Sequence, residues 1–127
     1  MNILGIDYGQ KKIGVATAES PLAEPHSVIR VESFDDAVSK IVQVVKRLNP
    51  EKIVVGLSEG QMANESRRFG SVIEQLTRIH VLFQDETLSS WEAQQKSIAG
   101  GKRRKKRKEM EDAYAATVIL QSYLDKI

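Results

Sequence analysis

Carboxylates that could bind a divalent cation stand at three separate places in this chain. Asp7 ends an apolar run, Asp85 and Glu86 follow another that ends at Phe83, and Asp112 opens the last helical segment. Carboxylates held close together raise one another's pKa, and a bound cation relieves the repulsion. Oxygen ligands without cysteine or paired histidine favour Mg²⁺ or Mn²⁺. Two such ions about 3.5–4 Å apart can activate water and stabilise the leaving oxygen during phosphodiester cleavage. The pattern therefore predicts a two-ion site.

Other catalytic chemistry has little support in the sequence. There is no cysteine, which excludes thiolate nucleophiles, disulfides and Cys-based zinc sites. The only two histidines, His26 and His80, both fall in strand-like runs, so we expect them to be structural. No convincing Ser/His/Asp set competes with the carboxylates.

Each acidic residue also has an ordinary structural interpretation. An Asp at a strand end often forms a turn, an acidic residue can cap a following helix, and one in a first helical turn interacts favourably with the macrodipole. Asp112, however, shares a helix face with Ala116, Ile119 and Tyr123, and a carboxylate on an apolar face is harder to explain as a surface charge. The small residues Ala115 and Ala116 would let this helix approach a sheet closely.

Hydrophobic periodicity predicts the elements that position these carboxylates. Apolar runs predict strands at 2–8, 13–18, 26–31, 52–57 and 80–83. A helix opens at Ser33, with Asp36 three residues on as in a capping box, and ends at Asn49-Pro50. We expect further helices at about 64–77, with Phe69, Ile73 and Leu76 on one face, and at about 89–98 and 109–125.

The order of these elements predicts the topology. Short connections favour an antiparallel meander for the first three strands, and right-handed crossovers make the last two parallel to the first. We expect an α/β fold with a five-stranded mixed sheet in the order 3-2-1-4-5 and helices on both faces. Ligands of such sheets gather outside the carboxyl ends of the strands. That edge is where all three acidic sites would meet.

The net charge of +2 hides a strong asymmetry. Seven consecutive basic residues, Lys102, Arg103, Arg104, Lys105, Lys106, Arg107 and Lys108, account for all the excess positive charge. Their structural alternative is a solvated loop. We favour an electrostatic clamp that holds a phosphate backbone over the carboxylates, because such contacts position nucleic acid without reading its sequence. Few aromatic residues are available for stacking on bases, so recognition of shape is expected.

Length and composition bound the remaining possibilities. At 127 residues, with 41% hydrophobic and 28% charged residues, we expect a single domain over 1–127. The first residues, MNILGIDYG, have neither the basic start nor the long apolar run of a signal peptide, and no segment approaches the length of a membrane span. We therefore expect a cytoplasmic protein without a membrane partner.

Four motifs at these same residues resemble those of one family. GIDYGQKKIGVA (Gly5–Ala16) is similar to the family's G-I-D-Y-G-x-K-R-I-G-V-A, and IVVGL (Ile53–Leu57) resembles its fourth-strand motif. DETLSSWEA (Asp85–Ala93) and DAYAATVILQSYLD (Asp112–Asp125) resemble its two later motifs. In this order, and over nearly the whole chain, they resemble the YqgF/RuvX family, whose members are described as Holliday junction resolvases or pre-16S rRNA nucleases.

The resemblance implies an RNase H-like fold and specific site residues. The family's metal ligands correspond to Asp7, Glu86 and Asp112, with Asp85 as a neighbour, and its catalytic carboxylates are the same three. The resemblance also implies that Lys11 and Lys12 lie in a turn beside the site, where they could contact phosphate. Related folds place a carboxylate after the fourth strand, so Glu59 remains an alternative for the second ligand.

Several functions remain open at this stage. The resemblance favours a nuclease that processes the 5′ end of pre-16S rRNA over a junction resolvase acting on DNA, as a monomer or weak homodimer. Thr87 replaces an arginine of the family motif, which motivates a non-catalytic nucleic-acid-binding module of the same fold. A sugar-kinase or actin-like ATPase also carries D-x-G in its first phosphate loop, but such proteins need two domains of this kind.

Overall fold

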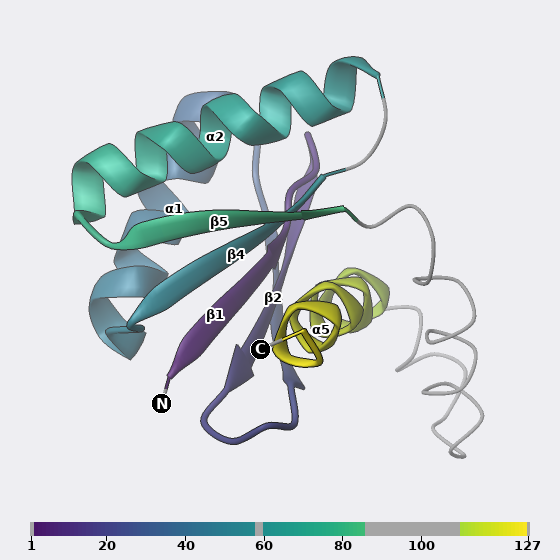
Figure 1. The fold of residues 1–127 in the computed structure, drawn as a ribbon. Helices are drawn as coiled ribbons and strands as arrows, with labels where there is room; N and C mark the ends of the chain where they lie inside the picture. Colours follow the sequence, from purple (N-terminus) through teal and green to yellow (C-terminus); the bar gives the residue numbers. More distant parts are fainter. Residues whose placement is uncertain (1, 58–59, 86–109, 127) are drawn as a thin grey trace.

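The first three strands form the predicted antiparallel meander (Figure 1). The computed structural model describes residues 2–57, 60–85 and 110–126. Within them, β1 (Ile3–Asp7) pairs with β2 (Lys12–Ala18), which pairs with the edge strand β3 (Glu24–Arg30). The start of β3 lies two residues earlier than predicted, because pairing resumes beyond a register shift between Val15 and Ala16. Pro25, which lacks an amide hydrogen, is tolerated on this edge strand.

The helix α1 (Phe34–Leu48) begins and ends at the predicted signals. The Ser33 side chain accepts a hydrogen bond from the Asp36 backbone N–H (3.0 Å), which satisfies one of the open amides of the first turn. Asn49 ends the helix in the left-handed region at φ 49°, a conformation that asparagine tolerates better than most residues.

Two parallel strands complete the sheet. The strand β4 (Lys52–Leu57) pairs with β1, and β5 (His80–Asp85) pairs with β4, so the order is β3-β2-β1-β4-β5, as predicted. The helix α2 (Gln61–Thr77) connects them and starts three residues earlier than expected. It buries Ser66, Phe69, Gly70 and Ile73, whereas Leu76 is 58% exposed. The prediction for Leu76 was wrong because the buried face of α2 continues from Ile73 towards Thr77, four residues on, and not towards Leu76.

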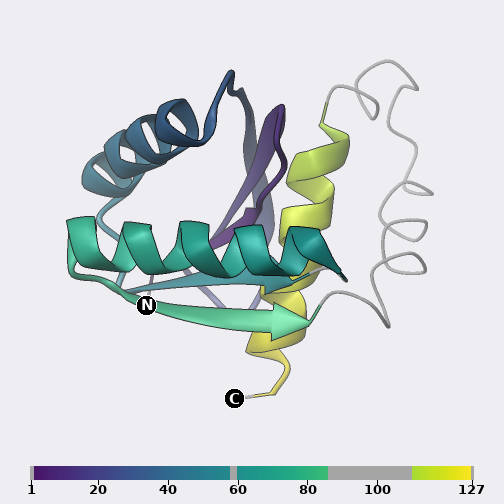
Figure 2. The same ribbon diagram turned by 90° about the horizontal axis from the view of Figure 1, so that it is seen from above.

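The two faces of the sheet carry separate apolar cores. One core lies between the sheet and the pair α1 and α2, and it includes Ile6, Val55 and Ile73. The other lies under α5 (Glu111–Leu124) and includes Ile3, Val54 and Leu120. Figure 2 shows α5 on the side of the sheet opposite α1 and α2. Helices on both faces were predicted, and they are confirmed.

Two further sequence predictions concern a helix at 89–98 and the membrane. The helix expected at 89–98 lies outside the described residues. Among the helices that the structure describes, none is both long and apolar enough to cross a membrane.

Candidate active site

Asp7 is the last residue of β1, and its side chain starts from the face of the sheet that α5 covers. Side chains alternate between faces along a strand, and Gly5, two residues earlier, faces the Leu120 side chain and the Ala116 carbonyl of α5. Asp7 pairs in register with Gly14 of β2. It is half-buried, next to the fully buried Ile6. The carboxylate is therefore held at the carboxyl edge of the sheet, as predicted.

Gly14 explains how Asp112 comes to lie beside Asp7. A Cβ atom at Gly14 would collide with the backbone oxygen and carbon of Asp112 and would lie 2.9 Å from the amide nitrogen of Ala113. The first turn of α5 therefore rests directly on the β2 residue that is paired with Asp7. Residues opposite each other in an antiparallel pair are about 4.5–5.5 Å apart at their Cα atoms. The two carboxylates thus start from neighbouring backbone positions on one face.

The N-terminal end of α5 adds a favourable field at this point. The structure gives the helix no side-chain cap at Met110, and Glu111 and Asp112 lie in its first turn. The positive end of a helix macrodipole stabilises nearby negative charge. The Asp7 carboxylate, on the strand beneath this turn, gains from the same effect.

Asp85 starts from the other face of the sheet. Its strand partner is Leu57, and the preceding residues of the same parity, Val81 and Phe83, contact Gly70 of α2. The alternation along β5 therefore directs Asp85 towards the layer of α1 and α2, away from Asp7. Glu86, Glu59 and Thr87 lie outside the described residues, so the choice of a further ligand stays a prediction.

A hydrogen-bonded group anchors the turn that follows Asp7. The two carboxylate oxygens of Glu65 on α2 accept hydrogen bonds from the Tyr8 hydroxyl (3.2 Å) and the Gln10 side-chain amide (3.0 Å). The Tyr8 ring lies 4.6 Å from that of Phe69, and the Arg68 guanidinium lies 4.2 Å from the centre of the Phe34 ring. Burial, together with the charge and hydrogen bond of Glu65, raises the pKa of Tyr8 to about 12.

Nothing in the sequence pattern indicated the role of Glu65, because its partners lie 55 and 57 residues away along the chain. Gln84 was also not predicted. It is buried, with 7% of its surface exposed, and pairs with Gly56 on the face that α5 covers. Its position directly after the apolar residues Val81–Phe83 is the one signal that could have drawn attention to it.

The predicted phosphate-binding lysines lie where expected, at the turn after Asp7. Lys11 precedes β2, Lys12 begins it, and both are exposed. The basic run at 102–108 lies outside the described residues. His26 and His80 are exposed residues of β3 and β5, and each forms a side-chain hydrogen bond, with Ser27 and Glu74 respectively.

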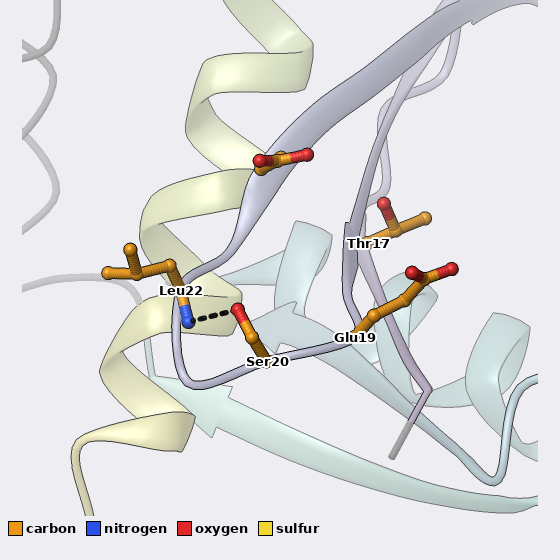
Figure 3. A pocket seen from close by; sticks show the side chains of 5 residues that line it. Thr17, Glu19, Ser20 and Leu22 are labelled. Atoms are coloured by element: carbon orange, nitrogen blue, oxygen red, sulfur yellow. Dashed lines mark hydrogen bonds between the residues drawn. The ribbon is translucent and has the colours of Figure 1, made fainter.

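A separate polar hollow of about 470 Å³ lies at the other end of the sheet (Figure 3). It is lined by Thr17, Glu19, Ser20, Leu22 and Glu24, and the Leu22 amide donates a hydrogen bond to the Ser20 hydroxyl (3.2 Å). Because Ile3 pairs with Ala18, this hairpin lies at the amino-terminal end of β1. The hollow is therefore not part of the carboxylate site.

The donor set that the fold brings together is incomplete within the described residues. In the ranges 2–57, 60–85 and 110–126, no group of three or more acidic, histidine or cysteine side chains could hold a metal ion. Asp7 and Asp112 supply two carboxylates from one face. Hard oxygen donors of this type suit Mg²⁺ or Mn²⁺, which keep several water ligands and need few from the protein.

Comparisons with known proteins agree with this architecture. A family model described as "RuvX: Holliday junction resolvase" matches residues 1–126. A relative from Caldanaerobacter subterraneus, described as a candidate pre-16S rRNA nuclease, is 41% identical over 134 residues, which cover 98% of this chain and 96% of the relative.

Solved structures share the fold at low sequence identity. Thermus thermophilus RuvC, in complex with a Holliday junction substrate, has a TM-score of 0.67 at 16% identity, covering 99% of this chain and 94% of that chain. The fowlpox virus Holliday junction resolvase has a TM-score of 0.68 at 13% identity and covers 100% of both chains. These likenesses confirm the predicted RNase H-like fold.

Proposed function

This chain belongs to the RuvX family of Holliday junction resolvases, and on that basis we propose that it is a metal-dependent nuclease acting on structured nucleic acid. We propose the 5′ end of pre-16S rRNA as the substrate, because the relative with 41% identity is described as a candidate pre-16S rRNA nuclease. The second candidate is a branched DNA junction, which the family description and the RuvC complex favour.

The observation that carries the enzyme assignment is the packing of α5 on β2. Gly14 lets the backbone of Asp112 rest on the strand residue paired with Asp7, so two carboxylates start from neighbouring backbone positions at the carboxyl edge. Carboxylates held close together repel each other, and a bound divalent cation relieves that repulsion. The arrangement thus supports a cation-binding role over a structural one.

We assign the roles of individual residues as follows. Asp7 and Asp112 hold Mg²⁺ or Mn²⁺, with Glu86 as the third ligand. When bound, a pair of such ions stabilises charge on the phosphate oxygens and lowers the pKa of water. Lys11 and Lys12 contact phosphates beside the scissile bond, and the basic run at 102–108 holds the backbone at longer range.

Substitution of either carboxylate tests this assignment. We expect Asp7→Asn and Asp112→Asn each to reduce cleavage by about 100-fold or more, since even residues that only orient metal ligands contribute about 10–100-fold. Cleavage of a 5′-extended 16S precursor and of a four-way DNA junction is measured with Mg²⁺ and with Mn²⁺. Asp125→Asn is the matched control, because Asp125 lies at the opposite end of α5.

The outcomes separate the candidates. Cleavage of the precursor RNA by the wild type and by Asp125→Asn, but not by the other two variants, supports the proposal. Metal-dependent cleavage of the junction alone would replace the RNA substrate with DNA. Binding of either substrate without cleavage, equal in all four proteins, would contradict the enzyme assignment and favour a binding module.

A further inference from the structure

Two cationic side chains stand opposite each other at the edge of the sheet where Asp7 lies. Lys12, the first residue of β2, pairs in register with Arg30, the last residue of β3. Both residues are exposed. The family resemblance implied a phosphate contact for Lys12, whereas Arg30 is distant in sequence and gave no signal.

The alternation of side chains assigns both cations to the face of the carboxylates. Gly14 faces the first turn of α5, so Lys12, two residues earlier on β2, starts from the same face. On β3, Ile29 packs into the core beneath α1 and α2, so its neighbour Arg30 is directed to the opposite face. Lys12 lies about 7 Å along the strand from Gly14, and therefore close to Asp7 and Asp112.

Two hydrogen bonds to backbone carbonyls stabilise the strand segments that carry these cations. The Lys40 ammonium donates a hydrogen bond to the Arg30 carbonyl (2.8 Å), and the Val31 amide donates one to the Lys11 carbonyl (2.9 Å). Like charges directly opposite each other destabilise a sheet. Among the residues that the structure describes, neither Lys12 nor Arg30 forms an ion pair. An anion bound between them would remove the repulsion.

We propose that Lys12 and Arg30 form a phosphate-binding pair, which seats a nucleic-acid backbone phosphate next to the one at the carboxylates. This inference rests on the proposed nuclease function and adds Arg30 to its binding residues. The planar guanidinium can donate two parallel hydrogen bonds to one phosphate, while the ammonium acts as a point charge. Such contacts fix the register of the backbone and read no base sequence.

Binding measured without metal tests the pair independently of cleavage. The full chain, in EDTA, is titrated onto fluorophore-labelled precursor RNA and onto the four-way junction over a series of salt concentrations. We expect Arg30→Gln to weaken binding about tenfold and to reduce the salt slope by about 0.7–0.9 for the lost contact. Arg67→Gln, an exposed arginine of α2, is the control and should leave both unchanged.

Thermal unfolding of the same variants separates binding from structure. Removing one of two opposed cations should leave the melting temperature unchanged or raise it, because the repulsion is lost. Arg30→Lys should keep the salt slope but bind more weakly than the wild type, since it loses the paired hydrogen bonds.

Several results would overturn the proposal that Lys12 and Arg30 bind a phosphate together. An unchanged salt slope in Arg30→Gln would do so, as would a fall in its melting temperature that accounts for the lost affinity. Absence of any nucleic-acid binding by the wild type would overturn it as well. If wild-type binding depends on Arg30 while no metal supports cleavage, only the proposed enzymatic function fails. If the wild type cleaves with metal but its binding does not depend on Arg30, only the phosphate-binding pair fails.

Discussion

At the scale of single residues, Tyr8 shows how the neighbourhood of Asp7 is held in place. Its phenol is buried, with 7% exposed, and donates a hydrogen bond to Glu65. Burial disfavours the phenolate, and the adjacent carboxylate disfavours it further. Because Glu65 also binds Gln10, a single side chain of α2 fixes the turn between Asp7 and the lysines.

The raised pKa predicts a specific alkaline instability. In the unfolded chain Tyr8 ionises near its ordinary pKa of 10.0, whereas in the folded protein its pKa is about 12. Its contribution to stability is therefore complete below pH 10 and is lost as the pH rises towards 12. We expect Tyr8→Phe to show a shallower loss of stability over this interval, measured by chemical denaturation at a series of pH values.

A spectrophotometric titration of the folded protein checks the same assignment. The chain has three tyrosines, and Tyr8→Phe should abolish the phenolate component that titrates near about 12. Glu65→Gln should shift that component to lower pH, because the charge of Glu65 contributes to the raised pKa. Glu51→Gln, an exposed carboxylate away from Tyr8, should not. A component unaffected by Tyr8→Phe would contradict the assignment.

At the scale of elements, the close approach of α5 to the sheet determines where Asp112 lies. Gly5 and Gly14 provide the space: a Cβ at Gly5 would lie 2.8 Å from Leu120 Cβ and 3.1 Å from the Ala116 carbonyl. The contact at Gly14 is tighter and involves backbone atoms of Asp112 that cannot rotate away. The position of α5 thus depends on the lack of a side chain at Gly5 and Gly14 as much as on the buried apolar residues of the helix.

Substitutions at the two glycines should therefore differ in effect. We expect Gly14→Ala to displace the first turn of α5. Overpacking typically costs about 1–3 kcal/mol of stability, and this substitution should reach or exceed the upper end of that range. Cleavage should fall with it, because Asp112 moves away from Asp7. Gly5→Ala makes a smaller overlap, with its nearest neighbours 2.8 and 3.1 Å away, and should be milder on both counts.

Denaturation and cleavage assays on both variants make this comparison. Since both substitutions crowd α5, Gly5→Ala serves as the control for general loosening of the helix. Equal effects of the two variants on cleavage would show that the position of Asp112 over Gly14 does not matter for activity.

At the scale of the whole molecule, one sheet separates two cores. Ile41 of α1 is fully buried on one face, and Ile119 of α5 is 1% exposed on the other. The strands β1, β2 and β4 contribute side chains to both cores, so neither layer can lose its packing without disturbing the shared strands. This coupling supports a single folding unit.

The shared sheet predicts one cooperative unfolding transition. We expect Ile41→Ala and Ile119→Ala each to destabilise the protein by about 2–5 kcal/mol while both layers still unfold together. Circular dichroism and tyrosine fluorescence, followed through the same denaturant series, should give coincident transitions in the wild type and both variants. Separate transitions, with only one shifted by each substitution, would indicate that the layers fold independently.

Local sequence signals were sufficient to predict the described helices and strands and their order. Alternating apolar runs, the Ser33 cap and the Asn49-Pro50 stop are local signals, and chain connectivity then allows few topologies. The positions of Asp7 and Asp112 at the carboxyl edge followed from that sketch. Boundaries differed by two or three residues at β3, β5 and α2. In the two strands, pairing continued beyond the apolar run.

The contacts between side chains from different elements became apparent from the folded chain alone. The register between β1 and β2 set Asp7 opposite Gly14, and Gly14 in turn admits Asp112. The alternation along β5 directs Asp85 to the other face. A one-residue change of register reverses every side chain, and contacts such as Glu65 with Tyr8 join distant segments. No local pattern encodes these pairings, because they depend on how the layers pack.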